Sequence, residues 1–397
     1  MNEKFSNLCN KRDSVVIFRN TGADPVIRNL LYLIETDTSN ISEFISCYSD
    51  FAEALYENTV NLSEYILRTV LECENMYIVK VAEGKTPDPI LHECLMHELA
   101  FFQELSQLTP EDFTENAEYD GFLPRWVTSD IDFIGSYTER VRLINHYGYG
   151  KYAKNKMFIL RQGEITAVKH PDTQKLSELY GYERERNQVV QNTLALLDGK
   201  NAQNVLLYGD AGTGKSSTVK ALVNEYHEKG LRLIEITKEQ LRDIPQIVDE
   251  ISSNPLKFII FIDDLSFASG EDCFGALKAM LEGSVSARAK NIAIYATSNR
   301  RHLIKESFSD REGDDIHRND TMQEMLSLSA RFGLRINFTR PDKKNYLSIV
   351  KQLAKQHNIQ TEESQIELKA EQFAISSGNG RSPRTAKQFI NQLINEN

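Results

Sequence analysis

Residues 204–217 read NVLLYGDAGTGKSS, and this stretch decides the fold of the chain around it. An apolar run at 205–208 leads directly into Gly209-x-x-x-x-Gly214-Lys215-Ser216, the spacing of a phosphate-binding loop (P-loop) between a strand and a helix. The glycines let successive backbone N–H groups point at a phosphate, and the following helix adds the positive end of its dipole. In this pattern the lysine reaches the β- and γ-phosphates, and the hydroxyl that follows it binds Mg²⁺.

The motif therefore predicts a nucleoside triphosphate site, for which we expect ATP and Mg²⁺ as the bound species. A tight glycine turn that binds nothing is the alternative interpretation. The loop residues predicted to contact the nucleotide are Gly209, Asp210, Ala211, Gly212, Thr213, Gly214, Lys215, Ser216 and Ser217.

A second signal follows downstream, where residues 258–264 read FIIFIDD. The apolar run predicts a buried strand that ends in two carboxylates. At the carboxyl edge of a parallel sheet, Asp263 can hold Mg²⁺ together with Ser216, and Asp264 can orient or deprotonate the attacking water. A pair of aspartates that only forms a turn is the alternative.

Polar residues also follow the strand predicted at 292–296, in the order Thr297-Ser298-Asn299. This places an amide at the same sheet edge as the two aspartates. Asn299 can hydrogen-bond the γ-phosphate or the attacking water. The alternative is a helix N-cap formed by Ser298 or Asn299.

From residue 176 onward, strand and helix signals alternate as in an α/β nucleotide-binding domain. The fold class that we predict is a parallel P-loop sheet flanked by helices, with a C-terminal helical lid and a mainly α-helical N-terminal domain. An acidic insertion at 309–320 is predicted to be a loop. The expected strands are 205–208, 231–236, 258–262, 292–296 and 334–338, and the expected helices are 183–197, 238–253, 273–287, 342–357, 363–377 and 383–395.

The front of the chain has a helical pattern and an unusual charge. Apolar residues recur every three or four positions from 27 to 79, which predicts amphipathic helices. Residues 41–120 contain 17 Asp and Glu but only three Lys and Arg, a local net charge of −14. We interpret the acids as a solvated face or as a surface for a basic partner. Such a surface repels a phosphate backbone and does not favour nucleic acid.

Two short strand signals lie outside the predicted α/β core. One is at Val15–Phe18, and the other is a hairpin formed by 157–160 and 165–168. His92 and His97 are reminiscent of a zinc-protease motif, but they are five residues apart and face different sides of a helix, so we expect no zinc site there.

The composition excludes several classes of protein. The 397 residues are 41% hydrophobic and 26% charged, as in ordinary globular proteins, and no apolar run has the length of a membrane span. The first residues lack the apolar stretch of a signal peptide, and the five cysteines show no CxxC spacing. We therefore expect a cytoplasmic protein with reduced thiols and no membrane partner.

Further motifs resemble those of the AAA+ ATPases. The sequence SARFG at 329–333 looks like the segment that carries their arginine finger, and GRSPRTA at 380–386 looks like their lid motif. The resemblance implies that Arg331 acts on the γ-phosphate of a neighbouring subunit and that Arg384 senses the γ-phosphate from the lid. Arg300 and Arg301 are rival fingers. The residues in the position of the family's adenine-packing turn are Leu179, Tyr180 and Gly181.

Longer strings give a closer resemblance. They are LYGY at 179–182, DDLSF at 263–267, LEG at 281–283, YATSNRRHL at 295–303 and SLSARFGL at 327–334. Together they resemble the bacterial ATP-binding proteins catalogued as a domain of unknown function, which have an acidic or helical front section.

The signals together predict three domains: an acidic, mainly helical domain at 1–170, a P-loop ATPase core at 171–340 and a helical lid at 341–397. The predicted activity is Mg²⁺-dependent ATP hydrolysis in a homo-oligomer that remodels a protein partner. The catalytic residues would be Asp264, Asn299, Arg331 and Arg384, and the metal ligands Ser216 and Asp263.

Three alternatives stay open at this stage: a DNA-associated motor or helicase-loader-like ATPase, a P-loop kinase for small molecules, and a nucleotide switch that does not hydrolyse. The acidic front section, and the lack of a recognisable DNA-reading module after the lid, favour a protein partner.

Overall fold

The computed structural model describes residues 3–115, 117, 119–266, 277, 281, 289–299 and 329–396. The chain divides into two compact units, Met1–Lys154 and Asn155–Asn397. No helix within the described ranges has both the length and the apolar composition needed to cross a bilayer. Most of the helix predicted at 273–287, the predicted loop at 309–320, and Arg300 and Arg301 lie outside the described residues.

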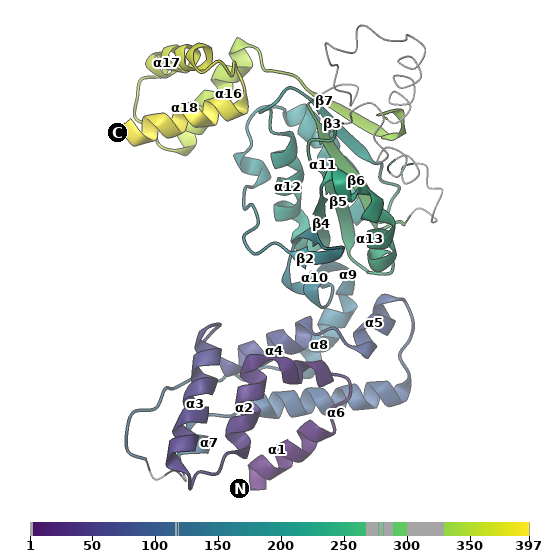
Figure 1. Ribbon diagram of the computed structural model, residues 1–397, viewed down its shortest axis with the longest axis vertical. Coiled ribbons are helices and arrows are strands. Elements are labelled where there is room, and N and C mark those ends of the chain that lie inside the picture. The colour runs from purple at the N-terminus through teal and green to yellow at the C-terminus, as the bar shows by residue number, and fades with distance from the viewer. Residues whose placement is uncertain are drawn as a thin grey trace. The chain divides into compact units, whose positions relative to one another are not determined.

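The first unit is built from helices, as predicted (Figure 1). Several of them begin where an Asn or Asp side chain accepts hydrogen bonds from the backbone N–H groups of the first turn, as Asp24 does for Val26 and Ile27. The helices are α1 (Glu3–Asp13), the 3-10 helix η1 (Arg19–Ala23), α2 (Pro25–Glu35), α3 (Ile41–Tyr56), α4 (Leu62–Glu72), α5 (Met76–Ala82), α6 (Pro89–Ser106), α7 (Pro110–Thr114), α8 (Phe133–Arg142), α9 (Ile144–Tyr147) and α10 (Lys151–Lys154).

An aromatic cluster lies in the core of this unit. The ring of Trp126 packs against Tyr48, Phe51 and Phe113, with centroid distances of 5.3, 4.9 and 5.9 Å. Its indole N–H donates a 2.7 Å hydrogen bond to the carbonyl of Leu108, so the buried ring leaves no unpaired donor.

The strand predicted at Val15–Phe18 is wrong. These residues form a turn between α1 and η1, and a side chain takes the place of a neighbouring strand. The carboxylate of Glu98, on α6, accepts hydrogen bonds from the backbone N–H groups of Val16, Ile17 and Phe18 at 2.8–3.0 Å. Apolar residues therefore face the core here without any sheet.

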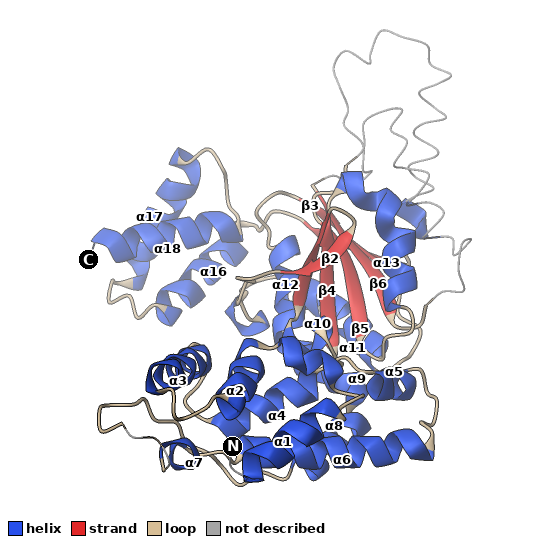
Figure 2. Ribbon diagram, turned by 60° about the horizontal axis from the view of Figure 1, so that its bottom comes forward, coloured by secondary structure: helices blue, strands red, loops and turns tan. Residues whose placement is uncertain are grey.

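The second unit contains a seven-stranded sheet in the order β2-β1-β4-β5-β6-β3-β7, drawn in red in Figure 2. All of its pairings are parallel except that of β1 with β2. Each strand predicted from residue 205 onward is present, and the fold class is confirmed. The strands are β1 (Met157–Arg161), β2 (Glu164–Ala167), β3 (Val205–Gly209), β4 (Leu231–Ile236), β5 (Lys257–Ile262), β6 (Ile292–Ser298) and β7 (Leu334–Phe338).

Helices cover both faces of this sheet. The chain crosses from β3 to β4 through α12 (Lys215–Tyr226) and from β4 to β5 through α13 (Ile244–Ile251), in opposite directions along the sheet. Because such crossovers are right-handed, the two helices lie on opposite faces, as Figures 1 and 2 show. Helix α11 (Glu183–Leu197) shares the apolar core of α12.

The division between the units differs from the predicted boundary at 170. The hairpin of β1 and β2 forms as predicted, but β1 also pairs in parallel with β4 through Met157, Phe158 and Ile159. The hairpin therefore belongs to the sheet of the second unit, which begins at Asn155.

Three helices form the predicted lid: α16 (Lys343–Gln356), α17 (Glu363–Ser376) and α18 (Pro383–Glu396). They pack around their own small core, which includes Tyr346, Val350, Ala370 and Ile390.

Candidate active site

The P-loop connects β3 to α12, and its glycines have backbone conformations that other residues rarely adopt. Gly209, Gly212 and Gly214 have φ angles of 127°, 78° and 91°. A Cβ on Gly209 would lie 2.3 Å from the carbonyl oxygen of Phe338 on β7, so only glycine fits against that strand. The loop is thus shaped by its own sequence and by the neighbouring strand.

Lys215 lies at the start of α12 and is buried, with 6% of its surface exposed. Its Nζ donates hydrogen bonds to the carbonyl oxygens of Gly209 (3.0 Å) and Asp210 (2.7 Å) and to Oδ1 of Asn299 (3.1 Å). Burial lowers the pKa of the Lys215 ammonium, although nearby aspartates oppose the shift. A buried cation inside a loop of backbone N–H groups suits an anionic ligand.

The carboxylate of Asp263 gathers three donors at the end of β5. Its Oδ1 accepts hydrogen bonds from Ser216 Oγ (2.6 Å), Thr297 Oγ1 (2.5 Å) and the backbone N–H of Asp264 (3.1 Å). A carboxylate directly beside a hydroxyl is the kind of oxygen pair with which proteins hold Mg²⁺. The oxygen atoms of Ser216 and Asp263 therefore have the chemistry that the predicted Mg²⁺ ligands need.

Asp264 and Asn299 form a second pair at this edge. The φ angle of Asp264 is 52°, and its backbone N–H donates a 2.9 Å hydrogen bond to Thr297 Oγ1. Its Oδ1 accepts a 2.8 Å hydrogen bond from Asn299 Nδ2. Asn299 thus connects the carboxylate of Asp264 to the ammonium of Lys215.

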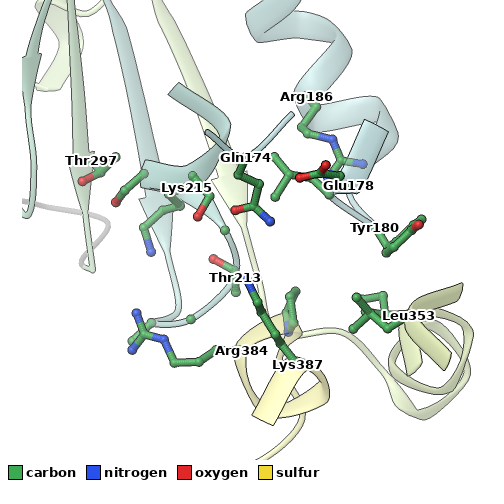
Figure 3. Close-up of a pocket in the computed structure, with 18 of the residues that line it drawn as sticks. Gln174, Glu178, Tyr180, Arg186, Thr213, Lys215, Thr297, Leu353, Arg384 and Lys387 are labelled. Carbon is green, nitrogen blue, oxygen red and sulfur yellow. The ribbon is translucent and has the colours of Figure 1, made fainter. Parts of the chain in front are cut away.

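These groups line one cavity of about 590 Å³, part of which is drawn in Figure 3. Most of the predicted site residues line it, while Gly181, Gly209, Asp210 and Arg331 do not. The predicted residues that line it are Leu179, Tyr180, Ala211, Gly212, Thr213, Gly214, Lys215, Ser216, Ser217, Asp263, Asp264, Asn299 and Arg384.

One end of the cavity lies between the turn at Leu179 and Tyr180 and the lid helix α16. Ile349 and Leu353 of α16 line it, and a Cβ on Gly181 would lie 2.8 Å from the end of the Ile349 side chain. The turn and the lid therefore meet at a close apolar contact, which suits a flat nucleobase.

Sequence reasoning missed several lining residues. In the sequence Thr297 is only one of the polar residues at a strand end, but in the structure its hydroxyl bonds the carboxylate of Asp263 and the backbone N–H of Asp264. The others are not marked as site residues by any sequence signal: three come from the segment before and the start of α11, and the rest come from the lid. They are Gln174, Glu178, Arg186, Ile349, Leu353, Gln356, His357, Pro383 and Lys387.

The lid contacts the P-loop directly. The backbone N–H of Arg384, near the start of α18, donates a 3.1 Å hydrogen bond to the carbonyl of Gly212. Figure 3 shows Arg384 and Lys387 extending from α18 beside the loop that carries Thr213. Arg381 instead forms a two-bond ion pair with Glu371 of α17, at 2.9 and 2.7 Å. Of these two arginines, Arg384 is the one that lines the cavity.

Arg331 lies elsewhere in the unit. It precedes β7, whose first residue, Leu334, pairs with Val205 at the start of β3. The P-loop follows the opposite end of β3, where Gly209 pairs with Phe338. Arg331 is therefore at the far end of this strand pair from the P-loop of its own chain.

The family described as "Protein of unknown function (DUF815)" matches residues 153–397, which is more than half of the sequence. The chain belongs to this family. Its mostly parallel P-loop sheet with flanking helices and C-terminal helices is the fold class that the sequence predicts.

Two individual proteins are similar to parts of the chain. The replication factor C large subunit of Staphylothermus marinus is 32% identical over 115 residues, which cover 27% of this chain and 26% of that protein. The Thermotoga maritima RuvB Holliday junction branch migration motor has a TM-score of 0.38 and 16% identity, over 55% of this chain and 63% of that one. The chain thus spans about a quarter of the first protein and less than two thirds of the second.

Proposed function

We propose that this chain binds ATP with Mg²⁺ in the cavity and hydrolyses it. The observation that carries the proposal is the convergence of three elements in one cavity: the buried ammonium of Lys215, the Ser216–Asp263 pair and the Asp264–Asn299 pair. A cation, an oxygen pair that suits a metal, and a carboxylate held beside them are the parts that phosphoryl transfer to water requires.

Binding follows from the two ends of the cavity. The nucleobase of ATP would lie between Tyr180 and the apolar residues of α16, and the triphosphate would lie against residues 211–217. Ser216 and Asp263 would hold Mg²⁺, which when bound neutralises charge on the phosphate oxygens. Lys215 would then exchange its present bonds to loop carbonyls and to Asn299 for phosphate oxygens.

Hydrolysis needs a general base beside the γ-phosphate, to accept a proton from the attacking water. Asp264 is the candidate, because its backbone and its carboxylate are both fixed, by Thr297 and by Asn299. It would accept the proton of the attacking water, a role that contributes about 10²–10⁴-fold in enzymes. Since Asn299 contacts both Lys215 and Asp264, movement of the lysine toward phosphate would also release the amide that holds the base.

Two variants test this proposal. Lys215→Ala should abolish ATP binding in an equilibrium titration, because the buried cation is lost. Asp264→Asn should bind ATP but release phosphate at least about 100-fold more slowly. Lys200→Ala is the matched control, since this exposed lysine pairs with Asp198 and does not line the cavity. Unchanged ATP affinity in Lys215→Ala would contradict the assignment of the site.

We propose further that Arg331 completes the site of a neighbouring subunit in a homo-oligomer. Its position far from the P-loop of its own chain supports this arrangement. In mixtures of Lys215→Ala and Arg331→Ala proteins, some interfaces would join an intact P-loop to an intact Arg331, and ATPase activity should return. A monomer in solution whose mixtures stay inactive would instead favour a kinase-like single-chain site.

The use of ATP that we propose is remodelling of a protein partner. The N-terminal unit supports this proposal, because its acids at Glu43, Asp50, Glu53, Glu57 and Glu64 are exposed and repel nucleic acid. Arg384 would couple nucleotide state to the lid, since its backbone already contacts Gly212. Salt-sensitive binding of duplex DNA by the purified chain would contradict this choice and favour a DNA-associated ATPase.

A further inference from the structure

A second cavity, of about 290 Å³, lies in the N-terminal unit beside α1, η1 and α2. Its apolar lining residues include Phe18, Ile27 and Phe102, each of which is almost fully buried. Gly22 also lines it, and a Cβ built on this glycine would meet no atom within 4 Å. The volume of the cavity is enough to accept one large side chain.

Four charged residues line this cavity together with the apolar residues: the arginines Arg12, Arg19 and Arg28, and one acid, Asp13. Arg12 forms ion pairs with Asp13 and Glu35. Arg19 donates a 3.2 Å hydrogen bond to the carbonyl oxygen of Val15, and Arg28 is exposed. In the part of the chain that the structure describes, neither Arg19 nor Arg28 has an acidic partner. Both arginines precede the acidic section at residues 41–120, which carries 17 acids and three bases.

The wall that carries Phe18 is held by a buried acid. Glu98 is 6% exposed, and its carboxylate accepts the backbone N–H groups of residues 16–18 described above. These bonds satisfy the buried charge and fix the turn from which Phe18 and Arg19 project. The cavity is thus shaped in advance of any ligand, which lowers the entropic cost of binding.

We propose that this cavity binds a segment of a partner protein in which a large apolar side chain lies next to a carboxylate. The apolar side chain would enter between Phe18 and Phe102, and the carboxylate would pair with Arg19 and Arg28. Guanidinium groups bind carboxylates with two parallel hydrogen bonds, which fixes orientation as well as charge.

The mouth of the cavity favours a protein segment over a free small molecule. Tyr32 lines the cavity with 57% of its surface exposed, so apolar surface continues from the cavity onto the outside of the unit. A peptide segment that crosses the mouth of the cavity would cover the ring of Tyr32. A small acid would fit within the cavity and leave the Tyr32 ring exposed to water. The proposal does not rest on nucleotide binding, because every residue that it uses belongs to the first unit.

The test uses saturation-transfer NMR on the full chain without nucleotide. The probe is an acetylated, amidated tripeptide with a phenylalanine between two aspartates, and the comparison peptide has two lysines instead. We expect transfer to the phenyl protons of the acidic peptide and about tenfold weaker binding of the basic one. Equal binding of both peptides would overturn the proposal. So would binding of 3-phenylpropionate as tight as that of the acidic peptide, which would assign the cavity to a small acid.

Variants locate the binding. Gly22→Leu should fill the cavity and remove the signal, and the Arg19→Glu, Arg28→Glu double variant should weaken binding about tenfold or more. Arg125→Glu, an exposed arginine that does not line the cavity, is the matched control and should bind as the parent does. If Gly22→Leu does not fold, the arginine variant decides alone. Retained binding in every folded variant would overturn the proposal.

Discussion

The carboxylate of Asp210, inside the P-loop, accepts a 2.8 Å hydrogen bond from the backbone N–H of Arg340, in the segment that leads to the lid. The N–H of Asp210 in turn donates to the carbonyl of Phe338 at 3.0 Å, and the hydroxyl of Tyr182 donates to the carbonyl of Thr339 at 2.6 Å. Three consecutive residues before the lid, 338–340, are therefore held by the P-loop and by Tyr182, which follows the turn at 179–181. Hydrogen bonds thus join the P-loop directly to the backbone from which the lid extends.

Asp210→Ala should loosen this connection. Hydrogen exchange at residues 339–345 should accelerate about tenfold, because the Arg340 N–H loses a charged acceptor that stabilises it by about 1.5 kcal/mol. Asp210→Asn keeps an acceptor oxygen and should exchange at nearly the parent rate. Equal rates in the alanine variant and the parent would show that the bond does not hold the lid segment.

Thr297→Val should impair the site without changing its shape. Valine matches threonine in volume but removes the hydroxyl that holds Asp263 and accepts the N–H of Asp264. We expect a loss of about 1–3 kcal/mol in the free energy of unfolding and about 100-fold in the rate of ATP hydrolysis. Thr297→Ser restores the hydroxyl and should recover most of both. A valine variant with the parent's hydrolysis rate would contradict the role that we give this residue.

The affinity for ATP should fall at alkaline pH. Burial lowers the pKa of Lys215 below its ordinary value of 10.5, and the protonated ammonium is the form that holds phosphate. As the pH rises through the lowered pKa, binding must take up a proton, so the dissociation constant should begin to increase at a pH below 10.5, the ordinary pKa of lysine. Lys215→Arg stays charged over this range and should show no such increase. Parallel pH profiles for the two proteins would rule out this lysine as the titrating group.

Glu98→Gln should destabilise the N-terminal unit. Glutamine keeps one acceptor oxygen but turns an amide NH₂ toward backbone N–H donors, and the negative charge that held three of them is lost. We expect a decrease of about 2–4 kcal/mol in the free energy of unfolding, measured with urea. Glu104→Gln, on the same helix, removes only an exposed pair with Lys11 and should change it by less than about 1 kcal/mol. Similar effects of the two changes would contradict the special role of Glu98.

The sequence predicts the sheet well for a physical reason. The strands at 231–236 and 334–338 match the structure at both ends, because in each of them apolar residues mostly alternate with charged or polar ones at the spacing of a strand. The residues predicted at the ends of neighbouring parallel strands, Asp263, Asp264 and Asn299, lie together as expected. Parallel strands have their carboxyl ends at the same edge of a sheet. The positions of these residues at the ends of their strands were therefore enough to predict that they lie together.

What the sequence does not predict depends on contacts between distant segments. Ile349 and Leu353 have the spacing of ordinary core residues on a helix, and nothing local shows that they also line a cavity. Val15–Phe18 has the composition of a strand, but the carboxylate of Glu98, far away in sequence, satisfies its backbone instead. Local patterns contain no information about such a partner.

The pairing of β1 with β4 has a consequence for how the family region can be isolated. A fragment that starts at residue 171 would lack the hairpin and leave β4 as a bare outer strand, with the backbone N–H and carbonyl groups that now bond β1 turned to solvent. Exposed strand edges of this kind recruit other chains, so such a fragment would precipitate or form filaments. A fragment that starts at residue 155 keeps β1 paired with β4 and should stay in solution without aggregating.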